Sequence, residues 1–303
     1  MNKTLITLSG PTASGKTSIA IRIAKALGAE IFSCDSRQFY EEMTIGTAVP
    51  TAAEQKEIPH HFIQHKSIHT PYSVGQFETD AIEALSYYYK QNDVAILVGG
   101  SGLYMHAVVH GIDQFPAVSE EIRSSLGERL QTNDLEDLQK ELQTLDPEHF
   151  EKMDIKNPSR VLRALGVCLA AGKPYSSFLN QKKPPRPFEV YPLSVDIPRA
   201  ILYDRINDRV DQMINAGLLL EAERLYPHRE LNALQTVGYK EIFDFFDGNI
   251  DLDQAISQIK QNTRNYAKRQ MTWIRRKETD AQNISYDCSD EELMAVLPNE
   301  TTL

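Results

Sequence analysis

Short apolar stretches alternate with longer amphipathic ones along the first 115 residues of the chain. The predicted strands are 4–9, 29–34 and 94–98, and the predicted helices are 16–27, 74–90 and 102–109. Strands that alternate with helices form parallel β-α-β units, because each helix carries the chain back across the sheet. The pattern therefore predicts an α/β fold in which helices cover both faces of a parallel sheet.

The pattern changes at about residue 116, where charged stretches with helical spacing replace the strands. Asp146-Pro147 and Asn157-Pro158 are typical helix starts, and Gly172 is a typical helix end. Residues 182–187 then have the composition of an extended connector. We therefore predict that residues 116–187 form an all-helical insertion.

The sheet pattern returns after this insertion. Residues 188–195 predict a strand, and Pro192 would place it at an edge of the sheet because proline lacks the backbone N–H. Further helices are predicted at 199–225 and 251–277, with a shorter one opened by 236–241. The predicted domains are the core (1–115 with 188–285), the insertion (116–187) and a peripheral C-terminal tail (286–303).

Composition narrows the class of protein. The chain has 303 residues, of which 41% are hydrophobic and 24% charged, so a packed core is expected and long disorder is not. No apolar segment approaches the roughly 20 residues that cross a membrane, and the N-terminus has no signal-sequence pattern. The three cysteines are scattered, which favours a reducing cytoplasm over a disulfide framework or a cysteine zinc site.

The charge is unevenly distributed along the chain. A formal net charge of −10 by itself argues against nucleic-acid binding. However, the segment from Arg264 to Lys277 carries six cations and no acid, and a second basic cluster lies between Lys173 and Arg186. The basic segments either line a groove for phosphates or form an ordinary solvated helix face.

Residues Gly10 to Thr17 match the phosphate-loop pattern G-x-x-x-x-G-K-[ST] between a predicted strand and a predicted helix. The glycines let successive backbone N–H groups point at an anion, and the helix start adds its positive dipole end. Lys16 would reach the terminal phosphate and Thr17 would ligate Mg²⁺. The predicted diphosphate-binding residues are Gly10, Pro11, Thr12, Ala13, Ser14, Gly15, Lys16 and Thr17.

Two other polar turns follow predicted strands, at the edge of the sheet where ligands bind. Asp35 follows the strand 29–34, and a carboxylate there can hold Mg²⁺ through water or accept a proton. The segment 99–102, Gly-Gly-Ser-Gly, follows the strand 94–98 and brings the Ser101 hydroxyl to the same edge. The alternatives are a turn-capping Asp and a tight glycine turn.

Other candidate groups are less specific. His106 and His110 lie one helical turn apart but lack a third metal ligand, so a structural role is favoured, as it is for His60-His61. Arg160 and Arg163 also lie one turn apart on the insertion. Their guanidinium groups suit phosphate-backbone contacts, and the alternative is a charged helix face.

The ordered set of motifs resembles the tRNA dimethylallyltransferase family, also called tRNA isopentenyltransferases. The phosphate loop alone is shared with hundreds of proteins, whereas the ordered set is highly specific. The matching segments are 10–17, 35–40, 45–48, 59–61, 72–77, 99–104, 160–165, 237–241 and 263–273. Val49 and Asn265 stand where many relatives have Lys and Arg.

The resemblance implies a P-loop NTPase-like core with a helical insertion that embraces the anticodon stem-loop of tRNA. It implies transfer of a dimethylallyl group from dimethylallyl diphosphate, with Mg²⁺, to the N6 amine of an adenine beside the anticodon. Asp35 would be the general base, acting with Lys16, Thr17 and Ser101. The implied tRNA-binding residues are Asp35, Ser36, Arg37, Gln38, Ser101, Arg123, Ser159, Arg160, Val161, Leu162 and Arg163. No membrane or protein partner is implied, and a monomer is expected.

Three other functions remain open at this point. An isopentenyltransferase acting on free adenine nucleotides would share the loop and base but would not need Arg160 and Arg163. A small-molecule kinase is disfavoured because the strand 94–98 ends in Gly99, where many P-loop ATPases have a magnesium-binding Asp. An RNA-binding module with a vestigial loop is disfavoured by the intact Lys16 and Asp35.

Overall fold

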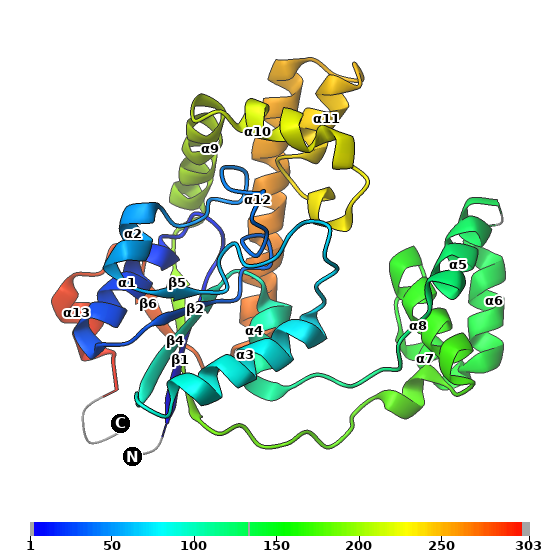
Figure 1. Cartoon of the computed structure of the whole chain (residues 1–303), viewed down its shortest axis with the longest axis horizontal. Helices are drawn as coiled ribbons and strands as arrows, with labels where there is room; N and C mark the ends of the chain where they lie inside the picture. Colours follow the sequence, from blue (N-terminus) through cyan, green and yellow to red (C-terminus); the bar gives the residue numbers. More distant parts are fainter. Residues whose placement is uncertain (1–2, 133, 299–303) are drawn as a thin grey trace. The chain divides into compact units, whose positions relative to one another are not determined.

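The computed structural model describes residues 3–132 and 134–298. The chain forms two compact units, one that joins residues up to His110 with those from Arg186 onward and one that spans 111–185 (Figure 1). The helical unit therefore begins before the predicted residue 116 and ends before residue 187. Phe115 explains the earlier start, because its ring stacks on Tyr175 of the same unit, with ring centroids 4.6 Å apart.

Within the described residues of the first unit, six strands form one parallel sheet in the order β3-β2-β4-β1-β5-β6. The strands are β1 (Thr4–Ser9), β2 (Ile31–Ser33), β3 (His60–His61), β4 (Val94–Gly99), β5 (Glu189–Asp196) and β6 (Gln282–Ser285). The parallel α/β prediction is confirmed. The short strands β3 and β6 were not predicted, because so few residues show no periodicity.

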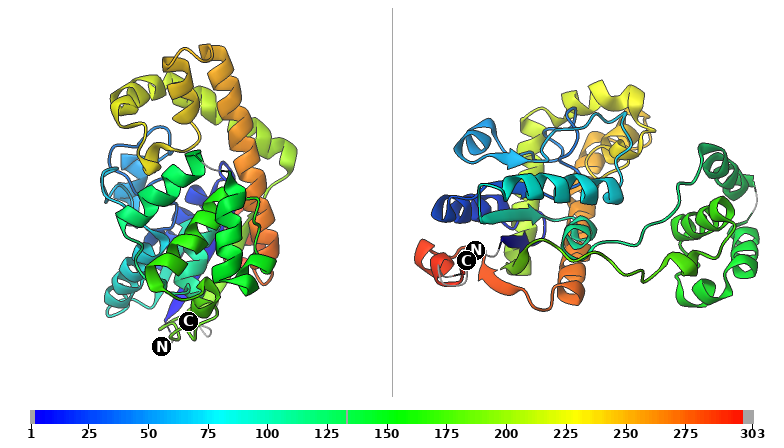
Figure 2. Two further views of the ribbon diagram at one scale, coloured as in Figure 1. Left: turned by 90° about the vertical axis from the view of Figure 1, so that its right-hand side faces the viewer. Right: turned by 60° about the horizontal axis from the view of Figure 1, so that its bottom comes forward.

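Helices cover both faces of this sheet (Figures 1 and 2). The α-helices described in this unit are α1 (Lys16–Leu27), α2 (Ala52–Glu57), α3 (Val74–Tyr88), α4 (Gly102–His110), α9 (Arg199–Asn215), α10 (Leu218–Leu225), α11 (Lys240–Phe246), α12 (Leu252–Lys277) and α13 (Asp290–Ala295). Side chains alternate across each strand, so Ile6 and Leu8 of β1 pack with α1 and α13, whereas Leu5 packs with α3 and α4.

The helices α9, α10, α11 and α12 build a second apolar cluster beyond the sheet, around Tyr239 and Ile242. The longest of them, α12, begins with a capping box in which Asp251 and Gln254 exchange side-chain-to-backbone hydrogen bonds. Farther along α12, Ala267 packs on Leu202 of α9. This helix therefore links the helical cluster to the sheet.

The single helix predicted at 199–225 is wrong, because α9 and α10 are separate helices. Gly217 lies between them with φ 100°, a left-handed backbone conformation that an α-helix cannot contain. Apolar residues keep a helical spacing on both sides of this glycine, so periodicity did not reveal the break.

The edge position predicted for the strand 188–195 is also wrong. β5 lies between β1 and β6, inside the sheet. β6 pairs only with Leu193 to Asp196 of β5, so Pro192 has β1 as its one paired neighbour. A missing N–H is tolerated there because no second strand requires it.

The peripheral tail predicted from residue 286 onward is wrong for the described part, which reaches residue 298. Leu293 and Leu297 are buried against α1, in the core on that face of the sheet. Arg22 of α1 also pairs with Asp290, at 2.6 Å between Nε and Oδ1. A few apolar residues within an acidic sequence are enough to anchor α13, and composition alone does not reveal them.

The second unit is all-helical, as predicted. Its helices are α5 (Glu120–Thr132), α6 (Leu135–Leu145), α7 (Pro147–Lys152), α8 (Pro158–Ala171) and the 3-10 helix η1 (Tyr175–Phe178). Asp146 and Asn157 cap α7 and α8 through their side chains, and a proline follows each cap. Leu138, Leu142 and Leu165 are buried in the core of this unit.

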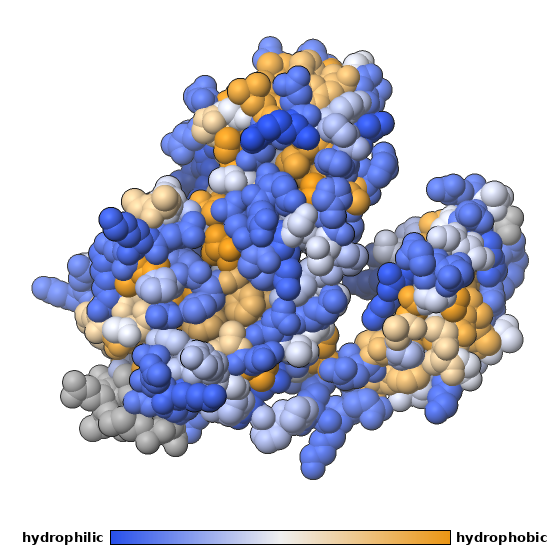
Figure 3. All heavy atoms as spheres, in the orientation of Figure 1, coloured by the Kyte–Doolittle hydropathy of each residue, from blue (hydrophilic) through white to orange (hydrophobic). Residues whose placement is uncertain are grey.

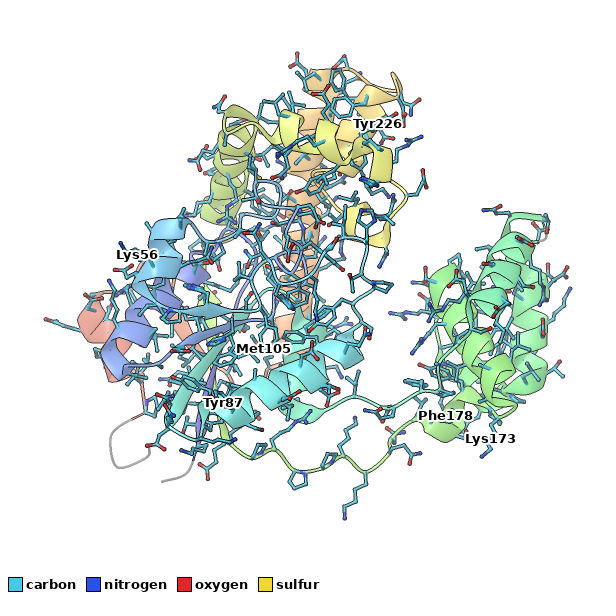
Figure 4. The ribbon with its side chains drawn as sticks, in the orientation of Figure 1. Lys56, Tyr87, Met105, Lys173, Phe178 and Tyr226 are labelled. Carbon is cyan, nitrogen blue, oxygen red and sulfur yellow. The ribbon has the colours of Figure 1, made fainter. Side chains whose placement is uncertain are left out.

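The surface carries few large apolar side chains. Tyr87, labelled on α3 in Figure 4, is 73% exposed, whereas Tyr88 and Tyr89 pack into the core. The face drawn in Figure 3 is mostly hydrophilic. Among the described residues, no helix combines the length and apolar character needed to span a membrane.

Candidate functional site

The phosphate loop lies between β1 and α1 and curls as its sequence predicts. Gly10 and Gly15 have φ of 156° and 93°, and a side chain at Gly10 would lie only 3.0 Å from Ser14 Oγ. The Lys16 ammonium donates to the Pro11 carbonyl at 2.7 Å, within its own loop. Burial lowers the pKa of Lys16 to about 8, although Asp35 opposes this shift.

A cavity of about 220 Å³ brings the loop and Asp35 together. Lys16, Thr17 and Asp35 line it, and so do Arg37 and Gln38. The sequence prediction that the loop and the carboxylate meet at one edge of the sheet is therefore confirmed. The site combines the phosphate-loop residues with a carboxylate that can accept a proton.

Several residues that line this cavity were not assigned to it from the sequence, among them Arg209 of α9 and Tyr266 of α12. Burial lowers the pKa of Arg209 and raises that of Tyr266, and both groups interact with Asp35. The sequence held one signal for Arg209, because this residue directly precedes Val210, which lies on the buried face of α9. Tyr266 lies in the matching segment 263–273, to which we assigned basic residues and no cavity residue.

The glycine turn after β4 is tied to the cavity by hydroxyl groups. Ser101 Oγ lies 3.1 Å from Ser36 Oγ and accepts the Ser36 N–H at 3.1 Å. The Tyr266 hydroxyl is hydrogen-bonded to Ser101 as well. This network sets the position of Ser36 directly after Asp35.

The same turn requires its glycines because α12 approaches so closely. A side chain at Gly100 would lie 2.2 Å from Gln270 Nε2, and one at Gly102 would lie 2.2 Å from the Trp273 ring. Gln270 accepts the Thr12 N–H at 2.8 Å and donates to the Gly100 carbonyl at 2.8 Å. One side chain of α12 therefore joins both glycine-rich turns.

Each histidine pair has contacts of its own within the described residues. The rings of His106 and His110 lie 4.7 Å apart between centroids, and His61 Nε2 lies 2.6 Å from Glu30 Oε2. Across residues 3–132 and 134–298, no cluster of three or more His, Cys, Asp or Glu side chains is arranged to hold a metal ion.

The candidate RNA-binding residues of the insertion lie mainly on its surface. Arg123, Ser159, Leu162 and Arg163 line a cavity of about 300 Å³ within this unit, and Arg160 is exposed. Val161 differs, because its side chain is fully buried between helices of the insertion. The Val161 side chain therefore serves packing, and its predicted contact with RNA would have to come from its backbone.

The fold and the cavity define a P-loop protein in which the phosphate loop and a carboxylate line one cavity. The family model described as IPP transferase matches residues 38–277. The chain belongs to this family of transferases.

Curated relatives with the name tRNA dimethylallyltransferase match most of the chain. The protein from Christiangramia forsetii is 54% identical over 276 residues, which cover 91% of each chain. The protein from Flavobacterium psychrophilum is 52% identical over 280 residues, which cover 90% of this chain and 91% of its own.

Solved structures share the fold. The tRNA isopentenylpyrophosphate transferase from Bacillus halodurans is 35% identical with a TM-score of 0.71, covering 97% of this chain and 94% of its own. A eukaryotic dimethylallyltransferase solved acting on tRNA is 26% identical with a TM-score of 0.79, covering 94% of this chain and 74% of its own.

Proposed function

We infer that this chain transfers the dimethylallyl group of dimethylallyl diphosphate to the N6 amine of the adenine beside the anticodon of tRNAs. The products are N6-dimethylallyladenosine in tRNA and diphosphate. The single observation that carries this proposal is the cavity shared by Lys16, Thr17 and Asp35. The names of the relatives supply the substrate class.

The phosphate side of the cavity suits departure of a diphosphate. Breaking the allylic C–O bond places charge on the leaving group, and the loop N–H groups with Lys16 are aimed at such charge. Arg209 adds a second buried cation to the lining. Both cations also neutralise the bound substrate, so they bind it before they stabilise the transition state.

We propose that Mg²⁺ accompanies the diphosphate and that Thr17 holds it. A hydroxyl ligand with no carboxylate cluster fits this ion, because Mg²⁺ is usually held by one or two protein groups plus phosphate oxygens and water. Zinc would need a fuller set of protein ligands. When bound, the ion would neutralise charge on the leaving diphosphate.

The carboxylate side of the cavity suits the acceptor amine. The N6 lone pair of adenine is delocalised into the ring, so the amine is a weak nucleophile until the new N–C bond forms. Its proton then becomes acidic, and Asp35 accepts it late in the reaction. Ser101 and Ser36 lie beside Asp35 and position the reacting groups.

The tRNA would be held at the cavity by the segment Asp35–Gln38, which includes Ser36 and Arg37, and by Ser101, and on the insertion by Arg123, Ser159, Arg160, Val161, Leu162 and Arg163. An anticodon-loop base is already unpaired, so turning it into a pocket costs about a few kcal/mol. The exposed cations Lys268, Arg269 and Arg275 of α12 suit contacts to phosphates. Such an enzyme acts where tRNA is found, so we propose a cytoplasmic location.

A transfer assay tests this function. The protein is incubated with Mg²⁺, radiolabelled dimethylallyl diphosphate and either an unmodified anticodon stem-loop or free AMP. We expect label in the RNA, lost with Asp35→Ala. Label in AMP alone would support the nucleotide-acting alternative, and ATP turnover without transfer would support the kinase alternative.

A further inference from the structure

In the part of the first unit that the structure describes, two buried carboxylates lie outside the cavity and take no part in the proposed chemistry. Glu221 of α10 is 2% exposed and Glu241 of α11 is 4% exposed. Burying a charged group is costly unless hydrogen bonds compensate. The donors that surround each carboxylate therefore indicate what it holds in place, and both sets of donors lead to Arg37.

Glu221 binds the backbone of the loop 44–46. Its Oε2 accepts the N–H groups of Thr44 and Ile45 at 3.0 and 2.8 Å, and its Oε1 accepts that of Gly46 at 2.9 Å. The Tyr239 hydroxyl donates to Oε1 at 2.7 Å. The carbonyl of Gly46 then accepts from Arg37 Nη2 at 2.9 Å.

Glu241 binds the second support of Arg37. Its Oε2 accepts the Gly238 N–H at 2.8 Å, and its Oε1 accepts from Asn262 of α12 at 2.7 Å. The carbonyl of the same peptide, that of Val237, accepts from Arg37 Nη2 at 2.6 Å. A carboxylate on one side and a guanidinium on the other polarise this peptide and strengthen both hydrogen bonds.

The guanidinium of Arg37 is thus held by two backbone carbonyls, each in a segment fixed by a buried carboxylate. The Arg37 N–H donates to Asp35 Oδ1 at 3.2 Å, so its position and that of Asp35 are linked. Gln38 is tied to the same loop, because its Nε2 donates to the Ala48 carbonyl at 2.9 Å. β2 ends at Ser33, and beyond it the Gln38 carbonyl accepts the Gln64 N–H at 2.8 Å.

We propose that Glu221 and Glu241 are positioning residues, which fix Arg37 and through it orient the segment Asp35–Gln38 toward the acceptor. This arrangement is named the Arg37 clamp. The clamp acts on the acceptor side of the cavity, whereas the phosphate loop does not depend on it. The identity of the acceptor rests on the proposed function, but the arrangement itself does not.

Glu221→Gln is the informative variant. All four groups hydrogen-bonded to Glu221 are donors, two on each oxygen. The glutamine amide has one oxygen and one NH₂ group, so its NH₂ must face two of these donors and both of those hydrogen bonds are lost. Glu223→Gln is the matched control, because Glu223 is exposed on the same helix. Tyr239→Phe removes one hydrogen bond while keeping the ring against Gly46, and it replaces Glu221→Gln if that variant does not fold.

Amide hydrogen exchange of the ligand-free protein tests the arrangement without any assay of activity. We expect exchange to rise about tenfold or more at 44–46 and also at 36–38 in Glu221→Gln, with no change in Glu223→Gln. Faster exchange confined to 44–46 would overturn the proposal, because it would show that loosening this loop leaves Arg37 and its neighbours in place. Unchanged exchange at both segments would overturn it too.

Kinetics test the consequence for the acceptor. At a temperature where the variant is folded, we expect the KM for the anticodon stem-loop to rise about fivefold or more, with the KM for dimethylallyl diphosphate changed less than about twofold. A mere loss of folded protein lowers kcat and moves neither KM, and that result would overturn the proposal. If the wild type transfers nothing to RNA, the proposed function fails, and the exchange result still decides the clamp.

Discussion

The phosphate loop and the segment Asp35–Gln38 face the same cavity, but different parts of the chain hold them. The loop 10–17 is contiguous, and its shape follows from its own glycines and from the start of α1. Asp35–Gln38 depends instead on Gly46, Val237 and two buried glutamates far along the chain. The sequence of the phosphate loop therefore indicates its shape, whereas the sequence of Asp35–Gln38 indicates candidate chemistry but not the distant residues that hold the segment in place.

The largest expected effect is a fall in kcat when the acceptor side of the cavity loses its carboxylate, while the phosphate side still binds its ligand. Asp35→Asn keeps the shape of the side chain but removes the proton acceptor, so kcat should fall by about 10² to 10⁴. Binding of dimethylallyl diphosphate, measured by calorimetry, should change little because the loop is intact. Asp204→Asn is a control, since Asp204 is exposed on α9. Retention of activity within tenfold of the wild type would show that another group takes the proton.

On the phosphate side of the cavity, the affinity for a diphosphate should depend on pH through Lys16. The pKa of Lys16 is about 8 because the ammonium is buried, so the free protein loses this charge as pH rises through 8. A bound diphosphate favours the charged form, so its affinity should be highest below pH 8 and fall by about tenfold per unit above it.

Lys16→Ala supplies the comparison for that profile. Removing one group that stabilises developing charge should cost about 10² to 10³ in kcat, and the decline in affinity above pH 8 should disappear. A decline that persists in the variant would assign the titration to another group. Thr17 is unsuitable as a control, because it faces the same cavity.

The parts predicted from sequence were those fixed by local pattern. The phosphate loop, the parallel sheet and the helical insertion each have a signal within a short stretch of chain. Gly217 and α13 were missed because periodicity is blind to one left-handed residue and composition is blind to a few buried side chains. Arg209 and Tyr266 reach the cavity through packing of α9 and α12, so their place in it follows from tertiary structure, and the buried neighbour Val210 was the one sequence signal for Arg209.

A moderate effect on stability is expected at Gly46, because the Arg37 clamp depends on the loop 44–46 that packs on Tyr239. A side chain at Gly46 would lie 2.6 Å from the Tyr239 ring, which is fully buried and cannot move away. Gly46→Ala should therefore lower the free energy of unfolding by about 1–3 kcal/mol through overpacking. Gly127→Ala is the control, because nothing lies within 4 Å of the added carbon. Equal stability of the two variants in urea would mean that the loop 44–46 yields easily and the clamp is loose.

The smallest effect concerns the exposed cations of α12, where each charge acts alone. Removing one phosphate contact should weaken binding of RNA only a few-fold and lower the slope of log K against log salt by about one. Lys268→Ala tests this, with Lys56→Ala as control, because Lys56 is exposed on α2 (Figure 4). The effect should be the same for any RNA sequence, since a phosphate contact carries no base information. If Lys268→Ala leaves the slope unchanged, the basic stretch is an ordinary solvated face, and recognition must rest on the cavity and the insertion.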